Sequence, residues 1–190
     1  MNDLPGDRRQ FFRNAFGQAI GRVARATEER IIQRHYVRPP GAMPEIAFLA
    51  ACTRCGQCAP VCPPHAITYV TSAGGLAAGT PQLDPARVPC IACADMPCAA
   101  ACPTEALVVP EHGWQGTRLG HVTFHPERCI TFEGDACTIC SAACPVGPTA
   151  LAVDADGHPV LKAEGCVACG VCVRECPTTP SSFTFTPLER

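Results

Sequence analysis

The apolar positions of the chain form one periodic stretch near the N-terminus and a series of short runs after it. From Asp7 onward the periodic stretch places an apolar or small side chain every three or four residues, which predicts an amphipathic helix. The positions of this stripe are Phe12, Phe16, Ile20, Val23, Thr27 and Ile31. Asp7 and Gln10 have the spacing of a helix-capping box. The segment "RPPGAMP" then ends the helix and is expected to form a stiff linker.

The later apolar runs are short and separated by turn-forming residues. Each of the four runs "HAITYV", "EALVV", "ALAV" and "SSFTF" begins a few residues after a Cys-Pro dipeptide. Runs of this length between Gly- and Pro-rich segments predict small β-strands. No apolar stretch approaches the ~18 residues that a membrane-spanning helix needs. The pattern indicates a small α+β domain with a helical N-terminal extension.

Composition indicates that such short elements do not build a large conventional core. The chain has 190 residues, with 16 Gly, 20 Pro and only 6% aromatic residues, but it has 16 Cys. Cysteine at this density indicates either disulfides or bound metal. Disulfides belong mainly to secreted proteins, and no convincing cleavable signal precedes the cysteines. We therefore expect metal ligands.

The cysteines fall into four cassettes, 52–63, 90–103, 129–145 and 166–177, each of which ends in Cys-x3-Cys-Pro. The third cassette departs most from the others, because seven residues separate its first two cysteines. The cassettes contain Cys52, Cys55, Cys58 and Cys62; Cys90, Cys93, Cys98 and Cys102; Cys129, Cys137, Cys140 and Cys144; and Cys166, Cys169, Cys172 and Cys176.

The spacing of these cysteines is typical of [4Fe–4S] cluster ligands. The bacterial ferredoxin run is Cys-x2-Cys-x2-Cys-x3-Cys-Pro, and its fourth cysteine ligates the cluster of a partner cassette. Each of the four irons of a cluster needs one thiolate, so four cassettes predict four clusters in two pairs. We expect the fourth cysteine to open a short helix. Zinc sites combine Cys-x2-Cys doublets at longer separations, and a radical S-adenosylmethionine site needs Cys-x3-Cys-x2-Cys, which is not found here.

The segments "RPPGAMPEIAFLAACTRCGQCAPVCPPHAI", "CIACADMPCAAACPTEAL" and "CVACGVCVRECPTTP" resemble the four-cluster electron-transfer subunits of molybdenum and tungsten oxidoreductases, MauM/NapG-type ferredoxins above all. The resemblance runs from about Arg38 to the C-terminus. It implies a duplicated bacterial 2[4Fe–4S] ferredoxin fold with small β-hairpins and short helices.

The resemblance also implies that the outer two cassettes pair with each other and the inner two do the same. A sequential pairing, first with second and third with fourth, is the alternative. The nested ligand sets are Cys52/Cys55/Cys58/Cys176, Cys166/Cys169/Cys172/Cys62, Cys90/Cys93/Cys98/Cys144 and Cys129/Cys137/Cys140/Cys102.

The N-terminal arm, residues 1–38, differs in charge from the polyferredoxin domain, residues 39–190. The arm has eight Arg and four acidic residues, whereas the domain has seven Lys or Arg and thirteen acidic residues. The arm is expected either to fold back on its own domain or to dock on another protein. A second copy is one such partner, and docking on it would give a homo-oligomer or a filament.

These observations predict an electron-transfer subunit of a larger oxidoreductase, and not a catalyst. The resemblance implies a molybdenum or tungsten enzyme as partner, and a tungsten aldehyde oxidoreductase also fits. An assembly factor for a cluster-containing reductase and a free soluble ferredoxin are the alternatives. Arg8, Arg9, Phe11 and Phe12 resemble a twin-arginine export motif. Charged residues interrupt the apolar run that such a signal needs, so a cytoplasmic location is expected over export.

Overall fold

The computed structural model describes residues 36–188. The helix predicted for the N-terminal arm lies outside the described residues. One compact unit runs from His35 to Arg190, and both Val37 and Arg38 are buried in it. The packed unit therefore includes Arg38, the first residue of the linker that the sequence predicts. No helix of residues 36–188 is long and apolar enough to cross a membrane.

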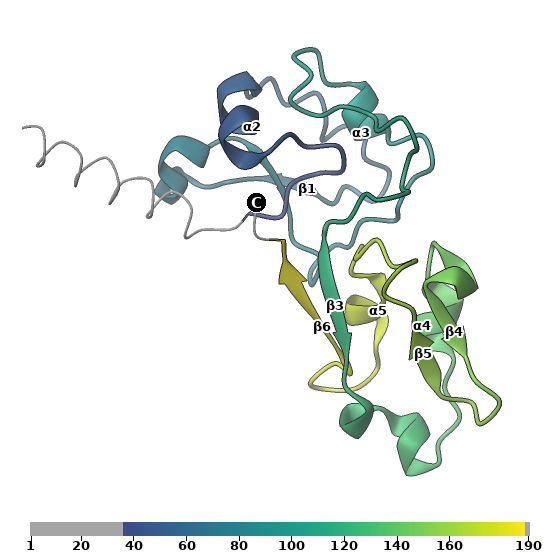
Figure 1. The fold of residues 1–190 in the computed structure, drawn as a ribbon. Helices are drawn as coiled ribbons and strands as arrows, with labels where there is room; N and C mark the ends of the chain where they lie inside the picture. The colour runs from purple at the N-terminus through teal and green to yellow at the C-terminus, as the bar shows by residue number, and fades with distance from the viewer. Residues whose placement is uncertain (1–35, 189–190) are drawn as a thin grey trace, which may run out of the picture. The chain divides into compact units, whose positions relative to one another are not determined.

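Short helices and three two-stranded antiparallel sheets make up the unit (Figure 1). The α-helices are α2 (Glu45–Ala51), α3 (Pro97–Ala100), α4 (Ile139–Ala143) and α5 (Val171–Glu175). The strands are β1 (Ile67–Tyr69), β2 (Pro81–Leu83), β3 (Gly120–Phe124), β4 (Leu151–Val153), β5 (Pro159–Leu161) and β6 (Phe183–Pro187). Short 3-10 helices are η1 (Ser72–Ala77), η2 (Pro126–Arg128), η3 (Ile130–Glu133) and η4 (Gly147–Thr149).

Strand pairing repeats along the chain and defines two halves. In the first half, β1 pairs with β2, and Ala42 ahead of the first cassette bridges to Leu107 behind the second. In the second half, β4 pairs with β5, and β3 ahead of the third cassette pairs with β6 behind the fourth. Each half is thus closed by a hairpin between its two cassettes and by a pairing of its two ends. This is the predicted duplication.

Three of the four predicted strand segments form strands. "HAITYV" contains β1, "ALAV" contains β4 and "SSFTF" overlaps β6. "EALVV" contributes only the isolated bridge at Leu107. Nothing in the apolar pattern marked β2, "PQL", or β5, "PVL". These three-residue strands form because a hairpin turn brings each of them beside a strand that the apolar pattern does predict, β1 for β2 and β4 for β5.

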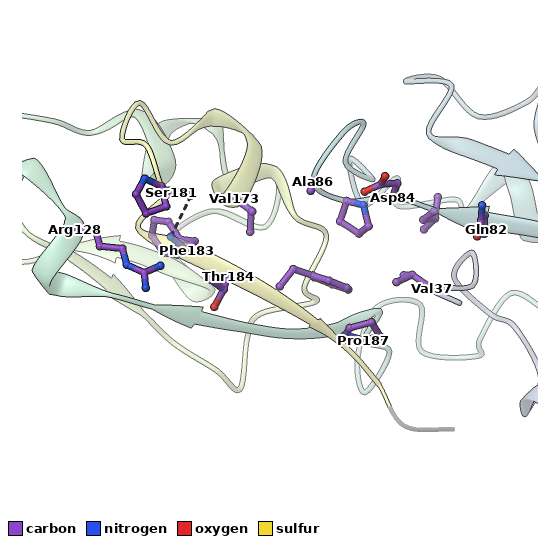
Figure 2. A pocket seen from close by; sticks show the side chains of 14 residues that line it. Val37, Gln82, Asp84, Ala86, Arg128, Val173, Ser181, Phe183, Thr184 and Pro187 are labelled. Carbon is purple, nitrogen blue, oxygen red and sulfur yellow. Dashed lines mark hydrogen bonds between the residues drawn. The ribbon is translucent and has the colours of Figure 1, made fainter. Parts of the chain in front are cut away.

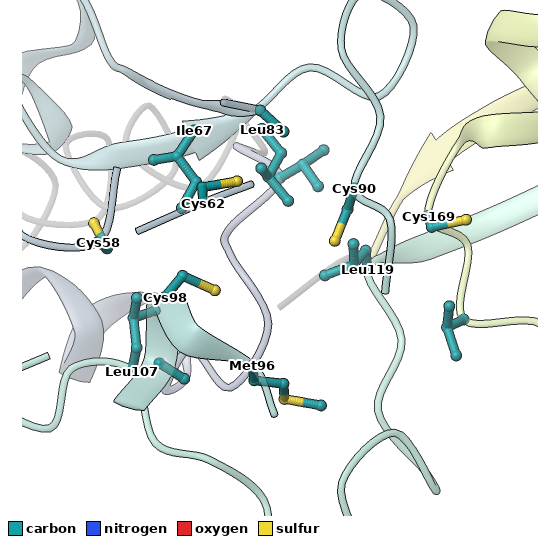
Figure 3. Close-up of a cluster of buried hydrophobic side chains, with 14 of the residues drawn as sticks. Cys58, Cys62, Ile67, Leu83, Cys90, Met96, Cys98, Leu107, Leu119 and Cys169 are labelled. Atoms are coloured by element: carbon teal, nitrogen blue, oxygen red, sulfur yellow. The ribbon is translucent and has the colours of Figure 1, made fainter. Parts of the chain in front are cut away.

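Buried side chains form two cores, and cysteines make up part of both. The first core lies mainly in the first half, but Val167, Cys169 and Val171 of the second half also belong to it. The first core surrounds Phe48, Met96 and Leu107, and it includes the buried Cys58, Cys62, Cys90, Cys98 and Cys169 (Figure 3). The second core is much smaller. Its buried members are Cys140, Leu151, Cys172 and Phe183. Because aliphatic packing is sparse, the interior depends largely on the thiols and on the groups that they bind.

The short helices precede the fourth cysteine of their cassettes, whereas the sequence predicts that they follow it. Helix α4 contains Cys140 and ends at Cys144, and α5 contains Cys172 and ends at Cys176. The ψ angles of Cys144 and Cys176 are 116° and 127°, so both residues are extended. Proline disfavours the helical conformation in the residue before it. The Cys-Pro dipeptide therefore stops a helix here and does not start one.

A buried arginine fixes the start of the domain to helix α2. The guanidinium of Arg38 donates to both carboxylate oxygens of Glu45, at 2.9 and 2.6 Å. It also donates to the Thr80 hydroxyl and the Pro81 carbonyl, and it lies over the Phe48 ring. Each of the three guanidinium nitrogens therefore donates at least one hydrogen bond. The segment predicted as a linker is thus part of the packed domain.

Candidate metal-cluster sites

The first thiol group joins three cysteines of the first cassette to the last cysteine of the second. Burial, together with the negative charges of Cys52, Cys55 and Cys102, raises the pKa of Cys58 to about 11. These four thiols are near enough to influence one another electrostatically. We call this group site 1.

The second group surrounds a small cavity in the first core. Cys62 of the first cassette lines this cavity together with Cys90, Cys93 and Cys98 of the second, and Trp114 closes one wall. Figure 3 shows the sulfur atoms of Cys62, Cys90 and Cys98 turned toward the same part of the core. We call this group site 2.

The second half repeats this arrangement. Burial raises the pKa of Cys140 to about 11, and its charged neighbours are Cys137, Cys129 and Cys176. This group is site 3. A second small cavity is lined by Cys144 of the third cassette and by the first three cysteines of the fourth, Cys166, Cys169 and Cys172. This group is site 4.

The structure therefore pairs the cassettes sequentially and not in the nested order that the resemblance implied. Cys102, and not Cys176, lies with Cys58, and Cys176 lies with Cys140. The reason is the strand pairing. Each hairpin and each closing pair of segments brings neighbouring cassettes together within one half. The spacing of the cysteines does not reveal this, because every cassette ends in the same Cys-x3-Cys-Pro.

The four sites follow one another in the order 1, 2, 4, 3. The negative charge of Cys58 in site 1 contributes to the raised pKa of Cys98 in site 2, so these two sites are neighbours. Between the halves, the Cys90 N–H donates to the Cys169 carbonyl at 3.2 Å, which places site 2 beside site 4. The negative charge of Cys140 in site 3 in turn contributes to the raised pKa of Cys172 in site 4, so these two sites are also neighbours. Sites 1 and 3 are therefore the ends of the row.

The loops between the first two cysteines turn backbone N–H groups toward sulfur. Ala92 and Ala168 occupy the same place in their Cys-x2-Cys segments, and both have positive φ, 50° and 54°. In this conformation the Ala92 N–H lies 3.4 Å from the sulfur of Cys90, and the Ala168 N–H lies 3.4 Å from that of Cys166. Donors aimed at sulfur stabilise the anionic ligand that a cluster requires.

Burial raises the pKa of several of these thiols. It raises the pKa of Cys90 and of Cys98 to about 12, and that of Cys169 to about 11. A thiol must lose its proton to bind iron, so loading of these sites releases protons. The raised pKa values thus indicate apolar surroundings, in which a bound cation has to balance the negative charge of the thiolates.

Two fourth cysteines behave in the opposite way. Burial alone would raise the pKa of Cys176, but hydrogen bonds from Thr178 and Ser182 lower it to about 7. At Cys102, burial is likewise outweighed by donors from Leu107, Thr104 and Ala106, so its pKa is lowered. These two cysteines belong to sites 3 and 1, the ends of the row.

The donors at sites 1 and 3 were not among the residues that the sequence marked. The Thr178 hydroxyl lies 3.1 Å from the sulfur of Cys176, and the Thr131 hydroxyl lies 3.2 Å from that of Cys129. The Thr104 hydroxyl is farther from Cys102, at 3.8 Å. The sequence does contain a pattern that marks Thr104 and Thr178, because a threonine follows the Cys-Pro of the second and fourth cassettes and not that of the first and third.

The donor sets fit [4Fe–4S] clusters. Each site brings together four thiols from two cassettes, and a cluster takes four such ligands. Within residues 36–188, no three Cys, His, Asp or Glu side chains stand close enough together to hold one metal ion.

Trp114 donates from its indole N–H to the Cys93 carbonyl at 2.8 Å. This hydrogen bond holds the loop of site 2.

A larger cavity of about 570 Å³ lies away from the thiols. Figure 2 shows Val37, Gln82 and Asp84 along one part of it, and Thr184 of β6 with Arg128 along another. None of the described residues that line it is a cysteine. It is therefore not a cluster site.

Comparison with known proteins identifies the family of the chain. The family model of the 4Fe–4S dicluster domain matches residues 51–106 and 89–148. The first match spans the first and second cassettes, which form sites 1 and 2, and the second match spans the second and third cassettes, which lie in different halves. The chain is 34% identical over 189 residues to the ferredoxin-type protein NapG of Escherichia coli, covering 92% of this chain and 79% of that protein.

Two further relatives extend the comparison. The methylamine utilization ferredoxin-type protein MauM of Paracoccus denitrificans is 36% identical over 179 residues, covering 90% of this chain and 78% of MauM. The polyferredoxin-like subunit of an aliphatic sulfonate oxidoreductase from Pyrococcus furiosus is 43% identical over 56 residues, covering 30% of this chain and 26% of that subunit.

Fold, thiol groups and relatives define an iron–sulfur protein of the ferredoxin class, an electron carrier and not a catalyst. Within that class the chain belongs to the family of the NapG and MauM ferredoxin-type proteins.

Proposed function

We propose that this chain is an electron-transfer subunit in which sites 1 to 4 each hold one [4Fe–4S] cluster. The ligand sets are Cys52, Cys55, Cys58 and Cys102 at site 1, and Cys62, Cys90, Cys93 and Cys98 at site 2. Site 3 uses Cys129, Cys137, Cys140 and Cys176, and site 4 uses Cys144, Cys166, Cys169 and Cys172. When bound, such a cluster takes up and releases single electrons.

One observation carries this proposal: the four thiol groups stand in a single row. The contact between the Cys90 N–H and the Cys169 carbonyl joins the two halves where sites 2 and 4 are neighbours. Buried residues insulate these inner sites, whereas Cys55 of site 1 is exposed. The protein thus supplies spacing, insulation and two ends at which partners exchange electrons.

The partner that we propose is the catalytic subunit of a larger oxidoreductase, a molybdenum or tungsten enzyme that includes aldehyde oxidoreductases as candidates. The polyferredoxin-like subunit from Pyrococcus furiosus supports a role of this kind, because its name places it in an oxidoreductase. The protein is expected to act in the cytoplasm.

The test is metal analysis of the native complex. The tagged protein is isolated from its own host without oxygen, and iron, molybdenum and tungsten are measured. We expect about sixteen irons per chain, with molybdenum or tungsten in a stoichiometric partner. Iron without a large partner contradicts the subunit role and favours a free carrier or an assembly factor. Clearly fewer than sixteen irons contradicts the four-cluster assignment.

The basic N-terminal arm is proposed to dock this subunit on an acidic surface, which a second copy also offers. Since Arg38 is buried against Glu45, the charge available for docking is that of residues 1–35, which is +3 from seven Arg and four acidic residues, and the rest of the chain has a charge of −5. Deletion of residues 1–35 should leave the iron content unchanged and abolish assembly. A truncated protein that still co-migrates with its partners would exclude this role.

A further inference from the structure

Site 3 differs from the other sites in the hydrogen bonds that reach its sulfur atoms. At sites 2 and 4, backbone N–H groups of Ala92 and Ala168 donate to sulfur at 3.4 Å. At site 3 two hydroxyls and one N–H reach two ligands. The Thr131 hydroxyl lies 3.2 Å from Cys129, and the Thr178 hydroxyl lies 3.1 Å from Cys176.

The third donor is the Ser182 N–H, which donates to the Cys176 sulfur at 3.3 Å. The Ser182 side chain is buried, and its hydroxyl lies 3.0 Å from that of Thr178. The two hydroxyls support each other beside the same sulfur.

The unusual spacing of the third cassette explains the second hydroxyl. In the second and fourth cassettes, the residue two positions after the first cysteine is an alanine that offers only its N–H. In the third cassette this residue is Thr131, at the start of the longer segment that forms η3 (Ile130–Glu133). The insertion thus replaces a backbone donor by a side-chain donor.

Thr131 is itself oriented by a histidine. Its hydroxyl lies 3.1 Å from Nδ1 of His158, whose ring stacks on Phe132 with centroids 4.0 Å apart. A thiolate sulfur only accepts hydrogen bonds, so the Thr131 hydroxyl has to donate to Cys129. His158 must then donate to Thr131 from Nδ1–H. The hairpin between β4 and β5 supplies His158, and the Asp154 carboxylate accepts its backbone N–H at 2.8 Å.

We propose that Thr131 and Thr178 are potential-determining residues that give site 3 the highest reduction potential of the row. This inference rests on the proposed function. A reduced cluster carries one more negative charge than an oxidised one, and hydrogen bonds to its sulfur ligands favour the reduced form. Site 3 would then be the end of the row where an electron is held most tightly.

Anaerobic redox titrations of the full-length chain, followed by electron paramagnetic resonance, test this assignment. We compare the unaltered protein with Thr131→Val, Thr178→Val and the double variant, because valine keeps the shape and removes the hydroxyl. The highest-potential signal should shift to a more negative potential in each single variant and further in the double variant. Thr131→Ser and Thr178→Ser retain a hydroxyl and should restore the original potential.

Thr104→Val is the matched control, because Thr104 occupies the same Cys-Pro-Thr position at site 1 with a longer contact of 3.8 Å. It should leave the highest-potential signal in place. The inference is overturned if both valine variants at site 3 keep that signal unchanged, or if Thr104→Val is the variant that shifts it. Iron content is measured on every sample. A shortage of iron in the unaltered protein contradicts the proposed function, whereas full iron with unmoved potentials contradicts only this inference.

Discussion

At the scale of single residues, conformation decides which side chain each cassette accepts. Gly170, directly after Cys169, has a φ of 90° and precedes helix α5. A Cβ at this position would contact the Cβ of Pro85 and lie 2.9 Å from the Pro85 carbonyl oxygen. The spacing of the cysteines identifies them as cluster ligands. The sequence alone does not show which glycine is needed because a side chain would not fit and which is needed only for its backbone angle.

Gly170→Ala should therefore lower the stability of the iron-loaded protein by about 2 to 4 kcal/mol. About 1 to 2 kcal/mol comes from the left-handed backbone, and the remainder from overpacking against Pro85. Gly157→Ala is the control, because Gly157 has a similar φ of 87° with nothing within 4 Å of the added Cβ. It should cost only the backbone part. Thermal unfolding without oxygen measures both, and equal losses would show that contact with Pro85 is unimportant.

The hydroxyl donors belong to the same scale. Thr104 and Thr178 stand in a readable Cys-Pro-Thr pattern, yet the pattern alone does not say which cluster each one serves. That assignment depends on which cassettes share a site. Thr131 has no such signal, because its role needs His158, twenty-seven positions away along the chain. Contacts of this kind become visible only once the strands are paired.

At the scale of elements, the sequence predicted the strands that follow cysteine but not their partners. β1, β4 and β6 have apolar runs, whereas β2 and β5 are three-residue strands that start with proline. The helices were placed on the wrong side of the fourth cysteine. The proline after Cys144 and the proline after Cys176 keep these fourth cysteines extended, so each helix ends before its cysteine.

The segment before α2 gives a second prediction. Arg38→Leu should destabilise the domain by about 3 kcal/mol, since it leaves the partly buried Glu45 carboxylate without its partner. The side chains of Arg38 and Glu45 are 1% and 19% exposed. Arg128→Leu is the control, because Arg128 and Glu127 are 3.8 Å apart, with exposures of 34% and 65%. Exposed pairs of this kind contribute less than about 1 kcal/mol.

Thermal unfolding of the iron-loaded variants separates these two cases. Loss of the buried pair should lower the midpoint clearly, and loss of the exposed pair should leave it almost unchanged. If Arg38→Leu unfolds at the same temperature as the unaltered protein, the segment at 38–44 is a linker after all. The sequence predicts a linker because "RPPGAMP" is rich in proline, and it contains no sign that Arg38 would find a buried carboxylate.

At the scale of the whole molecule, the order of the cassettes in space depends on pairings between distant segments. The repeat of four cassettes predicted a duplicated fold, and the two halves have that organisation. The sequential pairing depends on Ala42 with Leu107 in one half and on β3 with β6 in the other. Because all four cassettes end alike, their cysteine spacing is equally compatible with a nested or a sequential exchange of ligands.

The uneven aliphatic packing of the two halves leads to the last prediction. The second core has four buried members, of which Cys140 and Cys172 are two. The first core is larger, and most of its aliphatic and aromatic side chains, such as Phe48, Leu83, Met96 and Leu107, come from the first half, whereas the second half contributes Leu119, Val167 and Val171. Because metal binding and folding are coupled in such domains, removal of iron should unfold the chain. The half with less aliphatic packing should lose its structure first.

Hydrogen exchange measured by mass spectrometry during slow anaerobic chelation follows both halves at once. Peptides from β3, β4, β5 and β6 should lose protection while those from β1, β2 and α2 still retain it, and circular dichroism should report loss of native structure when iron is gone. Earlier loss in β1 and β2 would show that aliphatic packing does not set the order. Native circular dichroism after complete iron removal would show that the thiols fold without their clusters, as an ordinary core does.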